Sequence, residues 1–279
     1  MKIDSHQHFW KLSRGDYGWL KPEMEVLYRD YFPEDLIPHL QEHEISKTIV
    51  VQAAPTMEET EFLLDLYEKT DFIAGVVGWI DLESDEFSKH YRRFRQHKGF
   101  VGLRPMLHDI SDDRWILRPK VMEHLKLLVE EDFPLDILIF PRHLPHILEL
   151  LDELPGLRAV IDHCAKPYIA KGELEPWKSE IDKVAKYKNV RCKLSGLITE
   201  AEHNKWTVED LKPYVSHVVN TFGPESVMYG SDWPVCLLSG TYSQVHNALV
   251  ETLPKELSQE EIEKIFGGNT REFYKLKID

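Results

Sequence analysis

The sequence predicts one α/β domain in which eight parallel strands close into a barrel and helices cover the outside. Three observations favour this fold. The chain has 279 residues, and one such barrel typically takes ~250 residues. Short apolar runs alternate with amphipathic segments along the whole chain. No glycine-rich loop follows the first run, where an open doubly wound sheet would bind a phosphate. We therefore expect a single (β/α)₈ TIM barrel over residues 1–279.

The expected strands are short, rich in β-branched residues and almost continuously apolar. Parallel strands that are covered outside and filled within have this pattern. We place them at residues 2–9, 47–53, 73–81, 100–106, 135–140, 158–163, 190–194 and 227–232.

The segments between the runs have helical spacing. Pro33, with two acidic residues after it, suits the start of the first helix. Thr56 and Glu59 have the spacing of a capping box at the start of the second. Further helices are expected at 118–131, 144–154, 177–187, from 207, at 242–253, near 258 and after 268, with a short polar crossover at 86–97.

Composition excludes several classes of protein. The net charge is −14, and no basic stripe is present, which argues against binding nucleic acid or an anionic membrane surface. Neither a signal peptide nor a membrane span is expected, because no apolar run approaches ~20 residues. The chain has three cysteines and no Cys-x-x-Cys, as expected of a reduced, cytoplasmic protein. A homodimer is compatible with the sequence, which does not decide the oligomeric state.

The first run contains a His-x-His pair, His6 and His8. Residues two apart on a strand point to the same face, so Asp4 is expected on that face too. Two imidazoles side by side can bind a metal ion or aim two donors at one oxygen atom. The pair alone is a weak signal, because the chain has 14 histidines.

Other expected strands bring partners to this pair. The working groups of such a barrel lie at the carboxyl ends of the strands, where the sixth run ends in His163 and the eighth in Asp232. Together with His6 and His8 they offer three imidazoles and a carboxylate. This set suits Zn²⁺ with an open position for water. Asp232, on the metal or beside it, would take a proton from the attacking water.

Four motifs together resemble the amidohydrolase superfamily, in its amidohydrolase-related (amidohydrolase 2) type. They are Ile-Asp-Ser-His-Gln-His-Phe-Trp at 3–10, Ile-Asp-His-Cys-Ala-Lys-Pro at 161–167, Tyr-Gly-Ser-Asp-Trp-Pro at 229–234 and Gly-Asn-Thr-Arg-Glu-Phe-Tyr at 268–274. Tyr-Gly-Trp-Leu at 17–20 and Gly-Leu-Arg-Pro at 102–105 are similar to one branch of it, the sugar-acid lactonases such as the L-fuconolactonases and L-rhamnonolactonases. The resemblance spans the whole chain.

The resemblance implies a hydrolase of carbohydrate metabolism that opens the ring of a sugar-acid lactone. His6 and His8 would be the metal-side or carbonyl-polarising pair, His163 their partner and Asp232 the general base. No lysine ends the fourth or fifth run, so a bridging carboxylated lysine is not expected. The cofactor would be at most one divalent ion, Zn²⁺ or Mn²⁺, and some relatives work without a metal.

The chemistry of lactone opening suggests further roles. The carbonyl oxygen gains negative charge in the transition state, and Arg104 would help the histidines to stabilise it. The long loop at 10–32 could cover the mouth as a lid. Aromatic rings suit a sugar's C–H faces, and cationic groups suit its hydroxyls or a carboxylate. On these grounds the expected substrate-binding residues are Trp10, Trp19, Arg142, His143, Lys166 and Trp233.

Three alternatives stay open. One is a metal-dependent decarboxylase, or another hydrolase, of the same superfamily. Another is a barrel without catalytic activity that binds a sugar acid or a partner protein. The third, a Ser-His-Asp mechanism, is disfavoured because the chain has no Gly-x-Ser-x-Gly turn.

Overall fold

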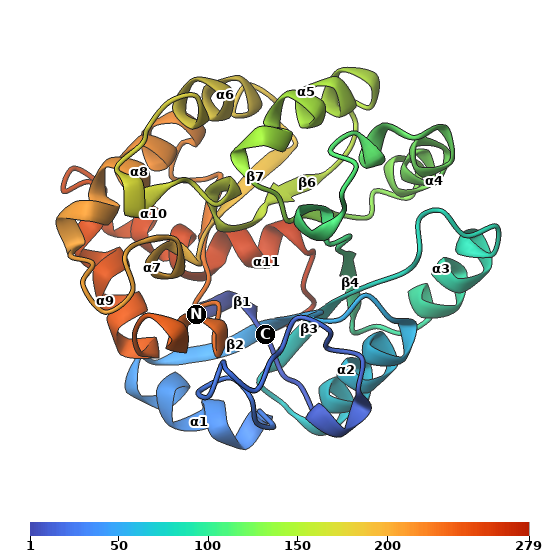
Figure 1. Cartoon of the computed structure of the whole chain (residues 1–279), viewed down its shortest axis with the longest axis horizontal. Coiled ribbons are helices and arrows are strands. Elements are labelled where there is room, and N and C mark those ends of the chain that lie inside the picture. Colours follow the sequence, from blue (N-terminus) through green and yellow to red (C-terminus); the bar gives the residue numbers. More distant parts are fainter. Residues whose placement is uncertain (279) are drawn as a thin grey trace.

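The computed structural model describes residues 1–278 and shows the expected single barrel (Figure 1). The eight strands follow one another around the ring in chain order, and each pairs in parallel with the next. They are β1 (Lys2–Gln7), β2 (Ile45–Val51), β3 (Ile73–Gly78), β4 (Phe100–Leu103), β5 (Leu135–Ile137), β6 (Ala159–Ile161), β7 (Val190–Leu194) and β8 (Val227–Tyr229).

Backbone hydrogen bonds beyond the end of β8 close the ring against β1. The amide of Asp232 donates to the carbonyl of His6 over 2.8 Å, and the amide of His8 donates to the carbonyl of Trp233 over 2.7 Å. We call this junction the β1–β8 seam. It brings the two ends of the barrel sequence into direct contact.

Helices surround the ring (Figure 1). They are α1 (Pro33–Glu42), α2 (Met57–Lys69), α3 (Phe87–Arg95), α4 (Pro119–Glu130), α5 (Leu144–Glu153), α6 (Trp177–Val184), α7 (Leu197–Glu200), α8 (Val208–Phe222), α9 (Tyr242–Thr252), α10 (Gln259–Glu263) and α11 (Asn269–Phe273). None of those in residues 1–278 is long and apolar enough to cross a membrane.

The start of α2 differs from the expected capping box. Thr56 does cap the helix, since its side chain accepts from the amide of Glu59. The Glu59 carboxylate does not return the bond to Thr56. It accepts instead from the amides of Ala53 and Ala54 at about 3.0 Å and 2.9 Å, so it holds the loop that follows β2.

Most strands are shorter than their apolar runs, and they end before the polar residues that follow. β1 stops at Gln7 rather than residue 9, and β6 and β8 stop at Ile161 and Tyr229. His8, His163 and Asp232 therefore lie just past the strands. The backbone leaves the sheet at these points, and the three side chains line the cavity at the mouth of the barrel.

The expected alternation along β1 is wrong at Asp4. The pairing of β1 with β2 shifts register between Asp4 and Gln7, which breaks the period of two. The Asp4 carboxylate faces outward and accepts from the hydroxyl of Tyr242 on α9 over 3.1 Å. His6 faces the barrel interior, where it lies 3.2 Å from the ammonium of Lys193.

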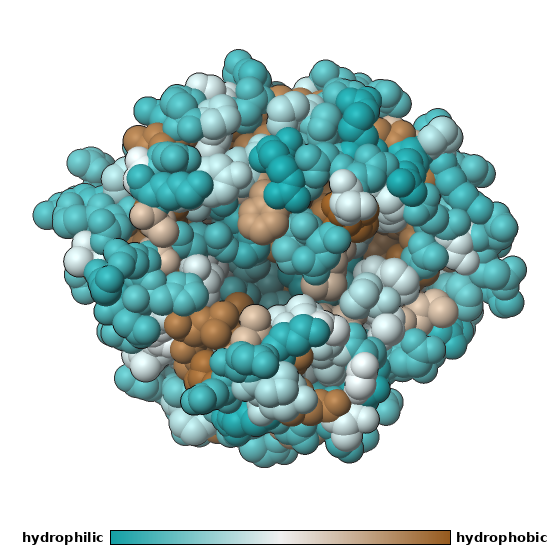
Figure 2. All heavy atoms as spheres, in the orientation of Figure 1, coloured by the Kyte–Doolittle hydropathy of each residue, from teal (hydrophilic) through white to brown (hydrophobic). Residues whose placement is uncertain are grey.

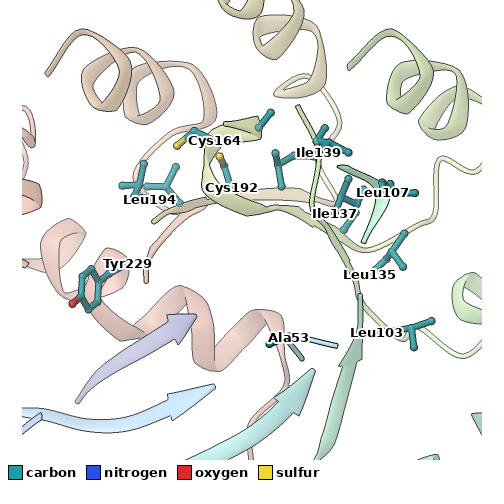
Figure 3. Packing of buried hydrophobic residues seen from close by; sticks show 14 of the residues in the cluster. Ala53, Leu103, Leu107, Leu135, Ile137, Ile139, Cys164, Cys192, Leu194 and Tyr229 are labelled. Carbon is teal, nitrogen blue, oxygen red and sulfur yellow. The ribbon is translucent and has the colours of Figure 1, made fainter. Parts of the chain in front are cut away.

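Apolar side chains fill the space between strands and helices. Figure 3 shows Ile137 beside Ile139, and Cys164 beside Cys192, at two places along this layer. A second cluster fills the barrel below the site and includes Tyr274, just past α11. The Tyr274 hydroxyl lies 2.7 Å and 2.9 Å from the two oxygens of buried Asp136, so the C-terminal segment anchors a charged group inside the barrel.

Replacing this hydroxyl should destabilise the fold. We expect Tyr274→Phe to lower the free energy of unfolding by about 1.5–3 kcal/mol, because a buried carboxylate loses a hydrogen bond. Tyr187→Phe is the matched control, since its hydroxyl bonds an aspartate at the surface, and it should change stability by less than about 0.5 kcal/mol. Urea unfolding followed by circular dichroism measures both. Equal losses would contradict this account of Tyr274.

Candidate functional site

A cavity of about 270 Å³ opens at the carboxyl ends of the strands. Its walls include His8, Arg104, His163 and Asp232, the residues that the sequence places at strand ends. Figure 2 shows that the face seen in Figure 1 is hollowed at its centre, with hydrophilic and hydrophobic residues around the hollow. A larger cavity of about 640 Å³ lies at the amino ends of β3 to β6. The chemistry-bearing residues gather at the smaller one.

Three imidazoles converge on one oxygen of Asp232. The Nε2 atoms of His8, His6 and His163 lie 3.2 Å, 3.7 Å and 3.8 Å from Oδ1 of the carboxylate. All four side chains are at least nine-tenths buried. The β1–β8 seam makes this possible, because it locks the residues after β8 against those of β1.

His8 has a defined orientation. Its Nδ1 lies 2.7 Å from the carbonyl of Val51, which can only accept, so Nδ1 carries a hydrogen. A neutral ring then turns the lone pair of Nε2 toward Asp232. Two lone pairs at 3.2 Å repel each other unless a proton or a cation lies between them. The site therefore favours a positive charge at this point.

His163 stands on a strained turn. Its backbone has a φ of 52°, which places a non-glycine residue in the left-handed region. Its Nδ1 contacts the hydroxyl of Ser195 over 2.8 Å, which orients Nε2 toward Asp232. Asp232 also has a positive φ, 57°. Strain of this kind at two neighbouring polar residues is typical of functional sites.

Burial sets the charge states of these groups. It lowers the pKa of His6 and of His163 well below the usual value for histidine, so both rings are neutral near pH 7. Burial alone would raise the pKa of Asp232, but the neighbouring His163 and His8 lower it overall. Neutral imidazoles around an ionised carboxylate are ready to accept a proton or to bind a cation.

Arg104 lies at the wall of the cavity and is 2% exposed. Its guanidinium donates to the backbone and side chain of Gln52 and to Asp162, and lies 3.4 Å from Nε2 of His6. Within residues 1–278 its Nε has no hydrogen-bond partner. A fixed cation beside a cavity suits a group that becomes negatively charged.

Buried charges lie beneath the site. Lys193 contacts Asp136 over 2.5 Å and Asp162 over 3.1 Å, and all three side chains are fully buried. Although burial opposes it, Lys193 and His6 hold the pKa of Asp162 well below its usual value. Burial raises the pKa of Asp136 to about 6. These ion pairs fix the surroundings of His6 and engage the ammonium of Lys193.

The arrangement fits a single divalent ion. Within residues 1–278, two sets of side chains offer ligand atoms within 4.8 Å of one another: His6, His8 and Asp232, and His6, Asp162 and His163. Both sets contain His6, so they overlap at that residue. Neutral imidazoles and a carboxylate are suitable ligands for Zn²⁺. The facing lone pairs of His8 and Asp232 are an independent sign that a cation suits this place.

The loop at 10–32, which the sequence suggests as a lid, is held at its ends and at Trp19 by hydrogen bonds. Backbone bonds between Trp10 and Tyr31 join the two ends of the loop. Trp19 donates its indole N–H to the carbonyl of Ala53 over 2.7 Å. Trp19 and Met24 reach the cavity wall from this loop.

Four residues expected to touch substrate do not line the cavity in the described part of the chain. Trp10 is fully buried inside the lid against Trp19 and Tyr31. Trp233 is 2% exposed and packs on Tyr31 and Phe9, away from Asp232. Those two rings pack against other aromatic side chains of the lid and of the β1–β8 seam instead of lining the cavity.

Arg142 and His143 also lie elsewhere. Both contact Asp113, over 3.0 Å and 3.1 Å. They follow β5 on a short 3₁₀ turn, Pro141–His143, where Arg142 is exposed and His143 is buried away from the cavity. Of the six expected substrate-binding residues, Trp19 and Lys166 line the cavity.

Sequence reasoning missed other residues of the cavity. Its polar part includes His108, Asp109, Thr199, Glu200 and His203, and its apolar part includes Met24, Met106, Leu138, Val235 and Leu238. All lie in loops or short helices after strands, where composition carries no periodic signal. The buried ion pairs had a detectable signal: Asp136 and Lys193 interrupt apolar runs, and a charge inside a strand requires a partner.

The chain is similar to known proteins over almost its whole length. Residues 3–276 match the amidohydrolase family. A protein of Burkholderia ambifaria named L-fucono-1,5-lactonase is 39% identical over 99% of this chain and 96% of its own. One of the same name from Burkholderia multivorans is 33% identical over 99% of this chain and 96% of its own. The crystal structure of an amidohydrolase from Burkholderia multivorans with bound Zn has a TM-score of 0.94, 33% identity and 99% coverage of both chains.

A glycine beside His163 offers a test of the site's geometry. Gly196 has a φ of +63°, and a Cβ there would lie 2.6 Å from Nδ1 of His163. Gly172 has a similar φ of +66° with open space around it. Gly172→Ala should therefore lower the free energy of unfolding by about 1–2 kcal/mol through backbone strain alone. Gly196→Ala should lose about 1–3 kcal/mol more, because the methyl group displaces the ring.

Urea unfolding measures the two losses, and histidine side-chain NMR signals report on the ring. We expect the His163 signals to move in Gly196→Ala and to stay in place in Gly172→Ala. Equal stability losses with unmoved signals would show that the close approach does not constrain His163.

Proposed function

Because this chain belongs to the amidohydrolase family, we propose that it hydrolyses a sugar-acid lactone, with L-fucono-1,5-lactone as the leading substrate. One observation carries the proposal: three imidazoles converge on an ionised Asp232, and His8, His163 and Asp232 line a small cavity at the mouth of the barrel together with Arg104. Two relatives named L-fucono-1,5-lactonase, matching over 99% of the chain, support the choice of substrate. The enzyme is a hydrolase of cyclic esters.

Asp232 acts as the general base. Its pKa lies below the usual carboxyl value, so it is ionised at neutral pH and can take a proton from water. The water attacks the lactone carbonyl without a covalent enzyme intermediate. Asp232 then returns the proton to the ring oxygen as that oxygen leaves, which completes the cycle.

The carbonyl oxygen becomes negatively charged as water adds. His8 polarises it from the cavity wall and His6 from behind that wall, and Arg104 adds a fixed positive charge. Fixed donors in a site shielded from water stabilise such a charge strongly, because they need no reorganisation during the reaction. His163 positions Asp232 and helps to keep its carboxyl group ionised.

His6, His8, His163 and Asp232 would hold a divalent ion. Such an ion polarises a carbonyl and lowers the pKa of bound water. Direct polarisation by the histidines stays the alternative role for the same side chains. Trp19 and Lys166 contact the substrate, whereas substrate contacts by Trp10, Arg142, His143 and Trp233 are not retained. The cytoplasmic location and the homodimer stay predictions from the sequence.

Removing the base should abolish most activity. We expect the wild-type chain to release acid from L-fucono-1,5-lactone, and Asp232→Asn to lower kcat by about 10²–10⁴-fold, the usual contribution of a general base. A pH-indicator assay over a panel of aldonolactones measures this. Asp112→Asn, at a surface ion pair with Arg118, is the control and should retain wild-type activity.

Wild-type kcat in a folded Asp232→Asn variant would show that another group is the base. Release of carbon dioxide from aromatic acids, with no lactone hydrolysed, would favour the decarboxylase instead.

Metal uptake tests the donor set. After chelator treatment, the protein should bind no more than one tight equivalent of Zn²⁺ by calorimetry. His8→Asn and His163→Asn should each weaken binding by at least about tenfold, because each loses a ligand. His90→Asn, on α3, is the control. Tight binding of two equivalents of Zn²⁺ would contradict a single metal site. Lactone hydrolysis by the chelator-treated protein separates the two roles of the histidines. Loss of activity favours metal ligation, and retained activity favours direct polarisation of the carbonyl.

A further inference from the structure

Four consecutive residues after β6 adopt left-handed backbone conformations. His163, Cys164, Ala165 and Lys166 have φ values of 52°, 52°, 61° and 50°. None is glycine, and each left-handed residue costs roughly 1–2 kcal/mol. A run of this kind persists only where the surrounding structure imposes it, and such strain concentrates at functional sites.

The turn places Lys166 beside His163. The amide of Lys166 donates to the carbonyl of His163 over 2.8 Å, which closes a tight turn of four residues. Side chains three apart in such a turn lie on the same side. Both His163 and Lys166 line the cavity, whereas Cys164 and Ala165 are fully buried. The strain therefore brings an ammonium into the site together with His163.

Lys166 meets Glu200 at the cavity wall. Its Nζ lies 2.5 Å from Oε1 of Glu200, and the two side chains are 19% and 18% exposed. Partial burial weakens the screening of this pair by water. Within residues 1–278 the Glu200 carboxylate accepts from Lys166 through Oε1 alone. Oε2 is free to accept, and the ammonium has further N–H groups to donate.

A fixed donor next to a fixed acceptor suits a pair of neighbouring hydroxyl groups. Each hydroxyl can donate and accept, so one can accept from Lys166 while its neighbour donates to Glu200. Thr199 adds a hydroxyl to this wall. Trp19 and Ala53 come from the loops after β1 and β2, and β2 lies across the ring from β6. The cavity thus offers a polar wall to hydroxyls and an apolar wall to C–H groups.

We infer that the Lys166–Glu200 pair recognises adjacent ring hydroxyls and sets the selectivity of the enzyme for polyhydroxylated lactones. This inference rests on the proposed lactone hydrolysis. The pair takes no part in moving the proton, which is the task of Asp232. A lactone without hydroxyls would bypass the pair and meet only the reacting groups.

Two lactones of the same skeleton separate recognition from chemistry. L-Fucono-1,5-lactone has a six-membered ring with a methyl group and three hydroxyls, and 6-methyloxan-2-one is the same ring without the hydroxyls. For wild type, Glu200→Gln and Lys166→Met, kcat/KM is measured on both with the full-length chain. The selectivity ratio is kcat/KM on L-fucono-1,5-lactone divided by kcat/KM on 6-methyloxan-2-one. This ratio should fall by about 10–100-fold in each variant, since a site built for hydroxyls loses their hydrogen bonds.

Glu202→Gln is the matched control. Glu202 also pairs with a lysine, Lys205, over 2.5 Å, but the side chains are 61% and 73% exposed and lie outside the cavity walls found in residues 1–278. Its ratio should equal that of the wild type.

A ratio within about threefold of wild type in Glu200→Gln and Lys166→Met would overturn the inference, as would equal losses on both lactones. In either case wild-type hydrolysis would leave the proposed function standing. A wild-type chain that hydrolyses neither lactone would overturn both.

Discussion

The β1–β8 seam is the constraint on which the site depends. Asp4, fully buried, accepts from the amides of His6 and Ser231 over 3.1 Å and 2.9 Å, so one carboxylate joins the two segments. Next to it the amide of Asp232 bonds the carbonyl of His6. His8 and Asp232 are 224 residues apart in the chain and 3.2 Å apart in space. Without closure of the barrel, neither Asp232 nor its imidazoles would have a defined position.

Below the seam, buried ion pairs hold the floor of the site. Lys193 and Arg104 balance Asp136 and Asp162, and His6 lies between them. Removing four charges from water is expensive, and such groups seldom contribute much net stability. Their value here is orientation, because the fully buried His6 ring holds one orientation beside Asp232 only when its surroundings are fixed. The Tyr274 hydroxyl extends this support to the C-terminal segment.

The sequence predicted the barrel and the polar residues at its strand ends for the same reason. Parallel strands have continuous apolar runs, and a polar residue at the end of such a run has few structural reasons to be there. His6, His8, Arg104, His163 and Asp232 were all recognisable in this way. Trp10 and Trp233 were not distinguishable from substrate-binding aromatics, because an aromatic residue beside a site looks the same in sequence whether its ring lines the cavity or packs behind it.

The sequence by itself determined the fold, the family and the strand-end residues, since all three follow from local periodicity and short motifs. Tertiary structure decided which loop residues reach the cavity. Glu200 became part of the site only because a strained left-handed turn aims Lys166 at it, 34 residues earlier in the chain. The register shift in β1 likewise turned Asp4 outward to hold the seam. Backbone torsions outside regular elements, and partners distant in sequence, set these directions, and neither leaves a periodic trace.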